Sequence, residues 1–118
     1  MHSLPRNCRL HNAVEFTAVI SLKNQVSGDL LQVYAKPNGL TYARLGMIVP
    51  KKIERHAVKR NWIKRIVRET FRKNWRSEYG DNMDWVIRLK RSIRKDESIR
   101  LVSEAQSLII ELQQCQDY

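Results

Sequence analysis

The stretch KRNWIKRIVRETFR, residues 59–72, constrains the fold most, because apolar and basic side chains recur there with the period of an α-helix. At about 100° per residue, the apolar side chains between Val58 and Val67 fall on one arc and the basic side chains fall on the other. We therefore expect a helix over about residues 56–75, with its apolar arc, including Trp62, packed beneath a sheet.

The basic arc of this helix is unusual for a surface that meets only water. Arg60, Lys64, Arg68 and Arg72 follow one another at i,i+4 spacing, and each like-charge pair costs roughly 0.2–0.5 kcal/mol in an isolated helix. Residues 51–76 carry eleven basic and two acidic side chains, so nearly all of the net charge of +10 comes from this segment. The pattern indicates a polyanion-binding surface, and the excess of arginine favours forked contacts to phosphate.

The rest of the chain shows both helical and strand patterns. Periodicity predicts helices over residues 11–22 and 98–115, and alternation predicts strands over 30–36, 41–49 and 83–90. Asn38-Gly39 lies between the first two strands, and both residues tolerate positive φ, which predicts a hairpin. The order α-β-β-α-β-α predicts an α+β fold, a two-layer sandwich of helices on a small mixed sheet, or else a small α/β layer structure.

Several classes of site are disfavoured by the sequence. No apolar run approaches the roughly 18 residues of a membrane span. Cys8 and Cys115 lack a metal-binding spacing, and we expect two reduced thiols rather than one disulfide between the ends of the chain. His2, His11 and His56 are dispersed and the twelve acidic residues are scattered. Because two-metal hydrolysis needs converging carboxylates, we expect the chain alone to be catalytically inactive, with no metal site.

The expected elements around the basic helix favour folded RNA as its partner. A helix with arginine and asparagine on its surface can enter a DNA major groove or bind folded RNA. A helix-turn-helix needs a short helix just before it, whereas a hairpin is expected here. Two alternatives stay open from the residues alone: a structural RNA-binding protein of the ribosomal type, and an amphipathic helix lying on an anionic membrane.

The order of the residues also resembles a known family. Residues 57–65 (AVKRNWIKR), followed by Arg68-Glu69-x-Phe71-Arg72, are similar to the RNR signature of the bacterial ribonuclease P protein subunit. The similarity continues through Arg9-Leu10, Glu15-Phe16, Tyr34, Arg44-Leu45-Gly46 and Val49-x-Lys51-Lys52. It runs in order from about residue 9 to 112, and the signature is long enough to be specific.

The resemblance implies a small basic protein bound to a catalytic RNA in the cytoplasm. In this family the ribonucleoprotein, an RNA endonuclease, removes the 5′ leader of precursor tRNA by Mg²⁺-dependent hydrolysis, and the RNA carries the chemistry. The resemblance also implies a left-handed β-α-β crossover, against the right-handed default, which the strand pattern does not predict. We expect residues 1–118 to form one ribonuclease P protein domain, with an ordered core over about residues 9–114, monomeric outside the complex and not bound to membrane.

The resemblance further implies two binding surfaces. The basic helix and the loop before it would face the RNA subunit through Lys51, Lys52, Arg55, Arg60, Asn61, Lys64, Arg65, Arg68 and Arg72. A cleft between the first helix and the open sheet face would hold the leader. If the half-polar faces of the strands align, its aromatic and basic side chains would be Phe16, Tyr34, Lys36, Arg44, Arg88 and Lys90. Aromatic rings beside positive charge suit single-stranded RNA. We expect Tyr34 to be exposed, because it shares a strand face with Gln32 and Lys36.

Overall fold

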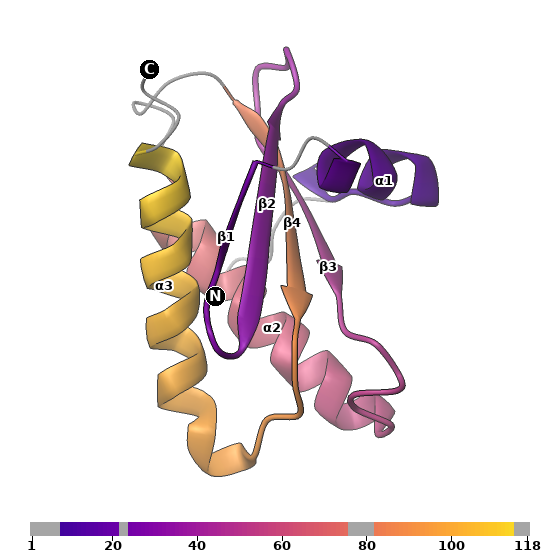
Figure 1. Cartoon of the computed structure of the whole chain (residues 1–118), viewed down its shortest axis with the longest axis vertical. Helices are drawn as coiled ribbons and strands as arrows, with labels where there is room; N and C mark the ends of the chain where they lie inside the picture. The colour runs from indigo at the N-terminus through magenta and orange to yellow at the C-terminus, as the bar shows by residue number, and fades with distance from the viewer. Residues whose placement is uncertain (1–7, 22–23, 76–81, 115–118) are drawn as a thin grey trace.

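The computed structural model describes residues 8–21, 24–75 and 82–114 (Figure 1). Its elements are α1 (Ala13–Ser21), β1 (Gln25–Ser27), β2 (Leu31–Pro37), β3 (Arg44–Ile48), α2 (Ala57–Asn74), β4 (Met83–Leu89), the 3₁₀ turn η3 (Lys95–Glu97) and α3 (Ser98–Gln114). The predicted helices and strands are confirmed, with ends that differ by a few residues. The sequence prediction lacked β1, whose three residues are too few to show an alternation.

The four strands form one mixed sheet in the order β1-β2-β4-β3. β2 pairs antiparallel with β4, and β3 pairs parallel with β4. The predicted hairpin between β2 and β3 is therefore wrong, because β4 lies between them. Gly39 does adopt a positive φ of 67°, but the Asn38 side chain donates to the Asp84 carboxylate of β4 at 2.9 Å. The connection after β2 thus crosses the end of β4 instead of turning back beside β2.

The connection from β3 through α2 to β4 is left-handed. In Figure 1 both strands point down the page, α2 lies behind the sheet and β4 lies to the left of β3. This is the opposite of the usual hand of parallel β-α-β units, and it confirms the crossover that the family resemblance implied.

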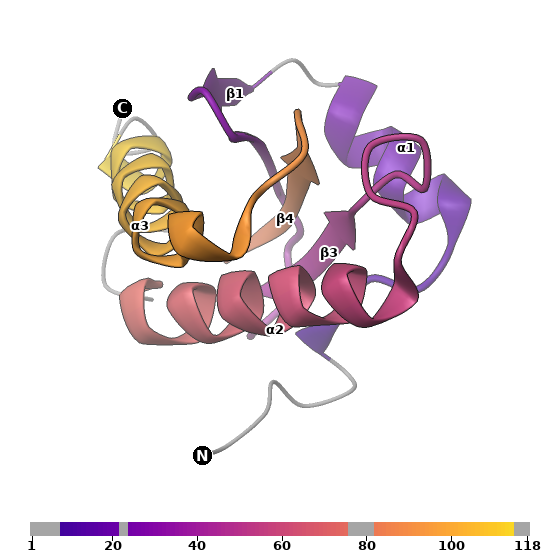
Figure 2. The same cartoon turned by 90° about the horizontal axis from the view of Figure 1, so that it is seen from below.

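Helices cover both faces of the sheet (Figure 2). α2 and α3 pack on the face that carries Leu31, Val33 and Ala35 of β2, as the alternation predicted. α1 packs on the opposite face, where Val19 contacts a smaller cluster with Val86. Tyr34 belongs to that smaller cluster and is only 6% exposed, so the expectation of an exposed tyrosine is wrong. Alternation assigns a side chain to a face, but it does not say which helix covers that face.

α2 is turned about its axis relative to the predicted arc. Ile63, Val67 and Phe71 are buried against the sheet, whereas Val58 is 84% exposed. Trp62 and Ile66 are half-buried on the flank toward α3 and pack against the edge of the core. The opposite flank carries the basic row, and its members Lys64 and Arg68 lie beside β3. The helix therefore has an apolar flank with Trp62 and Ile66, a basic flank with Lys64 and Arg68, and a solvent-exposed side between them.

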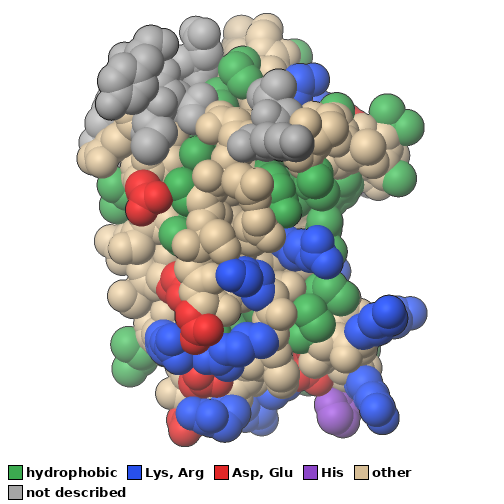
Figure 3. Space-filling model, viewed as in Figure 1, with side chains coloured by type: hydrophobic (Ala, Val, Ile, Leu, Met, Phe, Trp, Pro, Cys, Tyr) green, Lys and Arg blue, Asp and Glu red, His purple; other side chains and the backbone are tan. Residues whose placement is uncertain are grey.

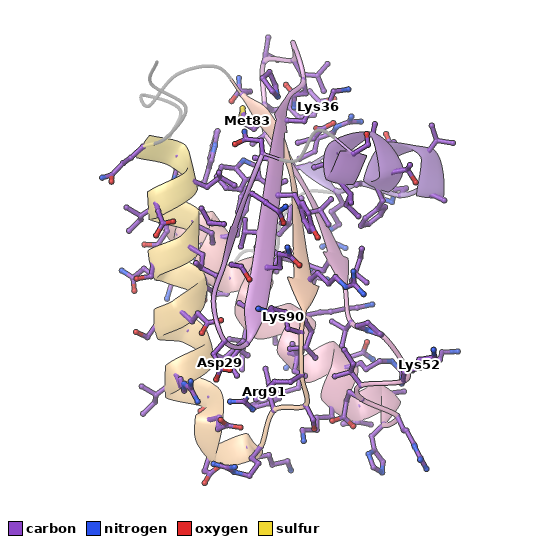
Figure 4. All side chains as sticks on the ribbon, in the orientation of Figure 1. Asp29, Lys36, Lys52, Met83, Lys90 and Arg91 are labelled. Atoms are coloured by element: carbon purple, nitrogen blue, oxygen red, sulfur yellow. The ribbon has the colours of Figure 1, made fainter. Side chains whose placement is uncertain are left out.

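The lower end of the sheet is fixed to α3 by charged groups. The Glu104 carboxylate accepts backbone hydrogen bonds from Asp29 at 3.1 Å and from Leu30 and Leu31 at 2.7 Å. Figure 4 shows Asp29 and Arg91 side by side, and the Arg91 guanidinium pairs with Asp29 at 3.1 Å and with Glu97 at 3.0 Å. The contact with Arg91 is the largest of the effects that lower the pKa of Glu97 to about 2, and the backbone N–H of Arg94 adds to it. These contacts join the β1–β2 turn, the end of β4 and the start of α3.

Candidate RNA-binding interface

The residues predicted to face the RNA subunit lie along α2 and the loop before it. Lys51, Lys52, Arg55, Asn61 and Arg65 are exposed, and Arg60, Lys64, Arg68 and Arg72 are half-buried. Figure 4 shows Lys52 reaching outward from the β3–α2 connection. The five exposed residues therefore face solvent, while the four half-buried residues form the basic flank of the helix.

A buried glutamate organises the loop that leads into α2. Glu54 is 5% exposed, and its carboxylate accepts the His56 backbone N–H at 3.1 Å and pairs with the Lys59 ammonium at 3.2 Å. The hydrogen bond from His56 is the largest of the effects that lower the pKa of Glu54. The Arg60 guanidinium donates to the carbonyls of Glu54 at 3.0 Å and Arg55 at 2.7 Å. Arg60 thus holds the loop as well as adding charge to the basic flank.

A small basic hollow lies where the basic flank of α2 meets β3 and α1. It has a volume of about 140 Å³, and Lys64 and Arg68 of α2 line it together with Arg9 and Phe16. The Arg68 Nε is buried and has no hydrogen-bond partner among the described residues. Burial is the main cause that lowers the pKa of Arg68, followed by repulsion from Arg9 and Arg65. An anion would relieve both effects, so the hollow is suited to a phosphate group.

The family resemblance assigned Phe16 to the leader of precursor tRNA, and Lys64 and Arg68 to the RNA subunit. The structure places all three side chains around one hollow. Phe16 is half-buried and lies so close to β3 that a Cβ on Gly46 would stand 2.5 Å from its ring. Figure 3 shows the molecule hollowed at its right edge, with hydrophobic side chains above and basic ones below. Nothing in the helical or strand patterns links residue 16 to residues 64 and 68, because the contact depends on how α1 and α2 meet at β3.

α1 is held over the sheet by Arg44. Its guanidinium donates to both carboxylate oxygens of Asp84, at 2.8 and 2.6 Å, and to the Glu15 carboxylate at 2.8 Å. Glu15 also accepts the His11 backbone N–H at 3.0 Å, which is the largest effect that lowers its pKa. The Asn12 side chain accepts the Glu15 N–H at 2.9 Å and the Glu15 carboxylate accepts the Asn12 N–H at 3.4 Å, a reciprocal cap that fixes the start of α1. Arg44 was predicted to contact RNA, but its charge is matched by two carboxylates.

The other predicted cleft residues follow β2 and β4 rather than meeting at one point. Figure 4 places Lys36 and Lys90 at opposite ends of the sheet. Arg88 is exposed and stands opposite Gln32 in the register of the two strands. The Lys90 ammonium donates to the Ser27 hydroxyl at 2.8 Å and to the Gly28 carbonyl at 2.7 Å. The lower part of this face, which α1 leaves open, is therefore polar and mostly basic (Figure 3).

Two further classes of site are absent from the part of the chain that the structure describes. Residues 8–21, 24–75 and 82–114 contain no group of three His, Cys, Asp or Glu side chains that could hold a metal ion. None of the helices in these ranges is long and apolar enough to cross a membrane. Cys8 is a free, half-buried thiol, and Cys115 lies outside the described residues, so the predicted redox state of the pair stays a prediction.

A family model for ribonuclease P matches residues 4–113. The chain belongs to the ribonuclease P protein family. The ribonuclease P protein component of Chromobacterium violaceum is 42% identical over 91% of this chain and 87% of that relative. The corresponding protein of Nitrosomonas eutropha is 44% identical over 92% of this chain and 90% of its own length.

Solved structures of the family share the fold. The ribonuclease P protein of Thermotoga maritima is 26% identical, with a TM-score of 0.65 over 91% of this chain and 96% of that one. The protein of Staphylococcus aureus is 23% identical, with a TM-score of 0.66 over 92% and 94% of the two chains. Family membership confirms the resemblance seen in the sequence. The chain is an RNA-binding protein subunit of a ribonucleoprotein endonuclease that processes tRNA.

Proposed function

We propose that α2 and the loop before it bind the catalytic RNA of ribonuclease P. The observation that carries this assignment is the basic hollow, where the buried Arg68 Nε has no hydrogen-bond partner among the described residues. Arg9 and Lys64 line the same hollow, so three cations surround a space that can take a phosphate. The exposed row of Lys51, Lys52, Arg55, Asn61 and Arg65 would extend the contact along the RNA backbone.

The 5′ leader of precursor tRNA would bind on the face of the sheet opposite α2, along the part of that face that α1 leaves open. Phe16 would provide the aromatic surface at the border of α1, while Arg88, Lys36 and Lys90 would supply positive charge along the strands. Burial of Tyr34 and pairing of Arg44 assign these two residues supporting roles: Tyr34 lies beneath α1, and Arg44 ties α1 to β4.

The protein would position RNA, and the chemistry would belong to its partner. Mg²⁺ would support the hydrolysis within the ribonucleoprotein, but the described residues bring no suitable group of oxygen donors together. We therefore assign no step of the hydrolysis to a metal held by this chain. The subunit would contribute positive charge that offsets the phosphates of the catalytic RNA and of precursor tRNA. It would be a cytoplasmic protein that is monomeric outside the complex.

Reconstitution tests this function. The chain mixed with a bacterial ribonuclease P RNA is expected to restore cleavage of precursor tRNA at a low Mg²⁺ concentration at which the RNA alone is slow. The Arg65→Ala variant should bind the RNA more weakly and lower the slope of log K against log salt by about 1, because one phosphate contact is lost.

Arg100→Ala is the matched control for this variant. It removes the same charge from α3, where the Arg100 guanidinium already pairs with Asp29 at 2.5 Å, so the salt slope should stay nearly unchanged. Folded wild-type protein that gave no stimulation of the RNA would rule out the proposed function. Equal slopes for Arg65→Ala and wild type would remove Arg65 from the interface.

A further inference from the structure

A second hollow lies on the apolar flank of α2, at the start of the helix that the sequence assigned to RNA but away from the side chains named for that contact. It has a volume of about 500 Å³ and is lined by His56, Val58, Lys59, Trp62 and Lys95. These residues come from the end of the β3–α2 loop, the first two turns of α2, and η3. None of the five belongs to the set that the family resemblance implied. The hollow therefore needs an explanation of its own.

The floor of this hollow is apolar and partly aromatic. Trp62 is half-buried, since it packs against the core and also lines the hollow. Val58 lies four residues earlier on the same side of the helix and is 84% exposed. On a helix whose other exposed positions are mostly polar (Asn61, Arg65 and Lys73), this pair leaves apolar surface in water that a bound ring would cover. A flat aromatic ligand suits such a floor.

The rim of the hollow is positively charged. Lys95 is exposed, and Lys59 pairs with the buried Glu54. The described lining contains no acidic side chain. α2 begins at the same place: its N-cap His56 makes no side-chain cap hydrogen bond, and its first turn has no acidic residue. The buried Glu54 carboxylate lies at the same end and accepts the His56 N–H, so Lys95 rather than the helix start supplies the charge for an anion here.

We propose that this hollow binds one unpaired nucleobase of the catalytic RNA, stacked on Trp62, with the adjoining phosphates near Lys95 and the start of α2. The apolar floor fits the base, and the cationic rim fits the backbone on either side of it. The inference rests on the proposed function, because the RNA that follows the Lys51–Arg55 loop would reach the start of α2 next. The hollow would thus recognise an unstacked base, in addition to the phosphate contacts made elsewhere on α2.

Substitution of Trp62 separates stacking from charge. Trp62→Leu keeps an apolar side chain against the core but removes the aromatic plane, and it should weaken binding to the catalytic RNA by roughly ten- to a hundredfold. Trp62→Phe keeps an aromatic plane and should lose much less. The salt slope should be the same in both variants as in wild type, because neither loses a phosphate contact. Lys95→Ala should instead lower the slope by about 1.

Trp75→Leu is the matched control. Trp75 is also half-buried against the same core and stacks with Phe71, with ring centroids 6.5 Å apart, but it does not line the hollow. Its replacement should change the melting temperature without weakening RNA binding. If Trp62→Leu bound the RNA as wild type does, the inference would be overturned. It would also be overturned if Trp62→Phe lost as much affinity as Trp62→Leu, because Trp62 would then act through packing.

A fluorescence titration identifies the ligand class without relying on cleavage. In a Trp75→Phe background, Trp62 is the accessible indole of the described residues, because Trp85 is fully buried. A single-stranded oligoadenylate of roughly ten nucleotides should quench this fluorescence, and a duplex of equal length should not. Quenching by polyglutamate but not by the oligonucleotide would overturn the inference in favour of an acidic peptide. Wild-type protein that bound no catalytic RNA would instead count against the proposed function.

Discussion

Replacement of Gly46 by alanine tests how firmly α1 holds Phe16 over the edge of the sheet. A Cβ at this position would stand 2.5 Å from the Cε1 and Cζ atoms of the Phe16 ring and 3.1 Å from the Leu10 Cβ. Carbon atoms in contact lie about 3.5–4.0 Å apart, so the ring would have to retreat by about 1 Å or more. Alanine itself meets no backbone obstacle at Gly46, because its φ lies outside the left-handed region.

The Phe16 ring cannot retreat together with its helix, since α1 is fixed on both sides of it. The Glu15 carboxylate pairs with Arg44 at 2.8 Å, and Val19 is fully buried. Overpacking of this kind costs about 1–3 kcal/mol. We therefore expect Gly46→Ala to lower the free energy of unfolding by that amount in urea denaturation. We also expect weaker binding of precursor tRNA that carries a leader, with leaderless tRNA nearly unaffected.

A double-mutant cycle isolates the contact. In a Phe16→Ala background the space around Gly46 is open toward α1, so the added methyl group should cost much less there, with only the 3.1 Å approach to the Leu10 Cβ left. The coupling energy between the two positions should then be about 1–3 kcal/mol. If Gly46→Ala cost the same with and without the Phe16 ring, the close approach would not limit this site, and the reasoning about α1 would be refuted. Equal losses for leader-containing and leaderless tRNA would show that Phe16 acts only in packing.

Two further predictions concern the charged groups that hold the fold. Arg44→Met should destabilise the protein by about 1–3 kcal/mol in urea denaturation, because it leaves the buried Asp84 carboxylate with one side-chain partner fewer at each oxygen; Arg44→Lys should recover only part of this, and no loss in the Met variant would contradict the role of Arg44. Glu97→Gln should remove the stability that depends on the lowered pKa of Glu97. That contribution is present above the usual carboxyl pKa of about 4.5 and disappears as the pH falls toward about 2. The melting temperatures of the variant and the wild type should therefore differ at pH 7 and converge near pH 2. A difference that stayed constant with pH would contradict this role of Glu97.

The elements themselves could be predicted from the sequence, because their patterns are local. The predicted helix over residues 56–75 matches α2 at Ala57–Asn74, and the faces of β2 and β4 follow the alternation. Strand order could not be predicted this way. The Asn38-Gly39 turn forms, with Gly39 at positive φ, but which strand lies beside β2 depends on β4, some 50 residues later in the chain. A turn signal carries no information about a strand that far away.

The candidate site shows the same division. The basic flank of α2 could be predicted, since charge and helical period are both visible in the sequence. The role of Arg44 could not, because its partners Glu15 and Asp84 lie 29 and 40 residues away. The exposure of Val58 was mispredicted for a related reason: the period defines an apolar arc, whereas the direction in which α2 lies against β3 and α3 decides which part of the arc is buried.

The position of β4 bears on how the chain can be made. β2 and β3 leave the ribosome early, yet each pairs with β4 and neither pairs with the other. Until residues 83–89 emerge, α2 has no complete sheet on which to bury Ile63, Val67 and Phe71. Contacts between such distant segments slow folding, and a nascent chain ending before β4 would leave this apolar surface exposed beside a strongly basic helix. α2 therefore cannot be excised as an autonomous unit, because its geometry depends on a strand translated after it.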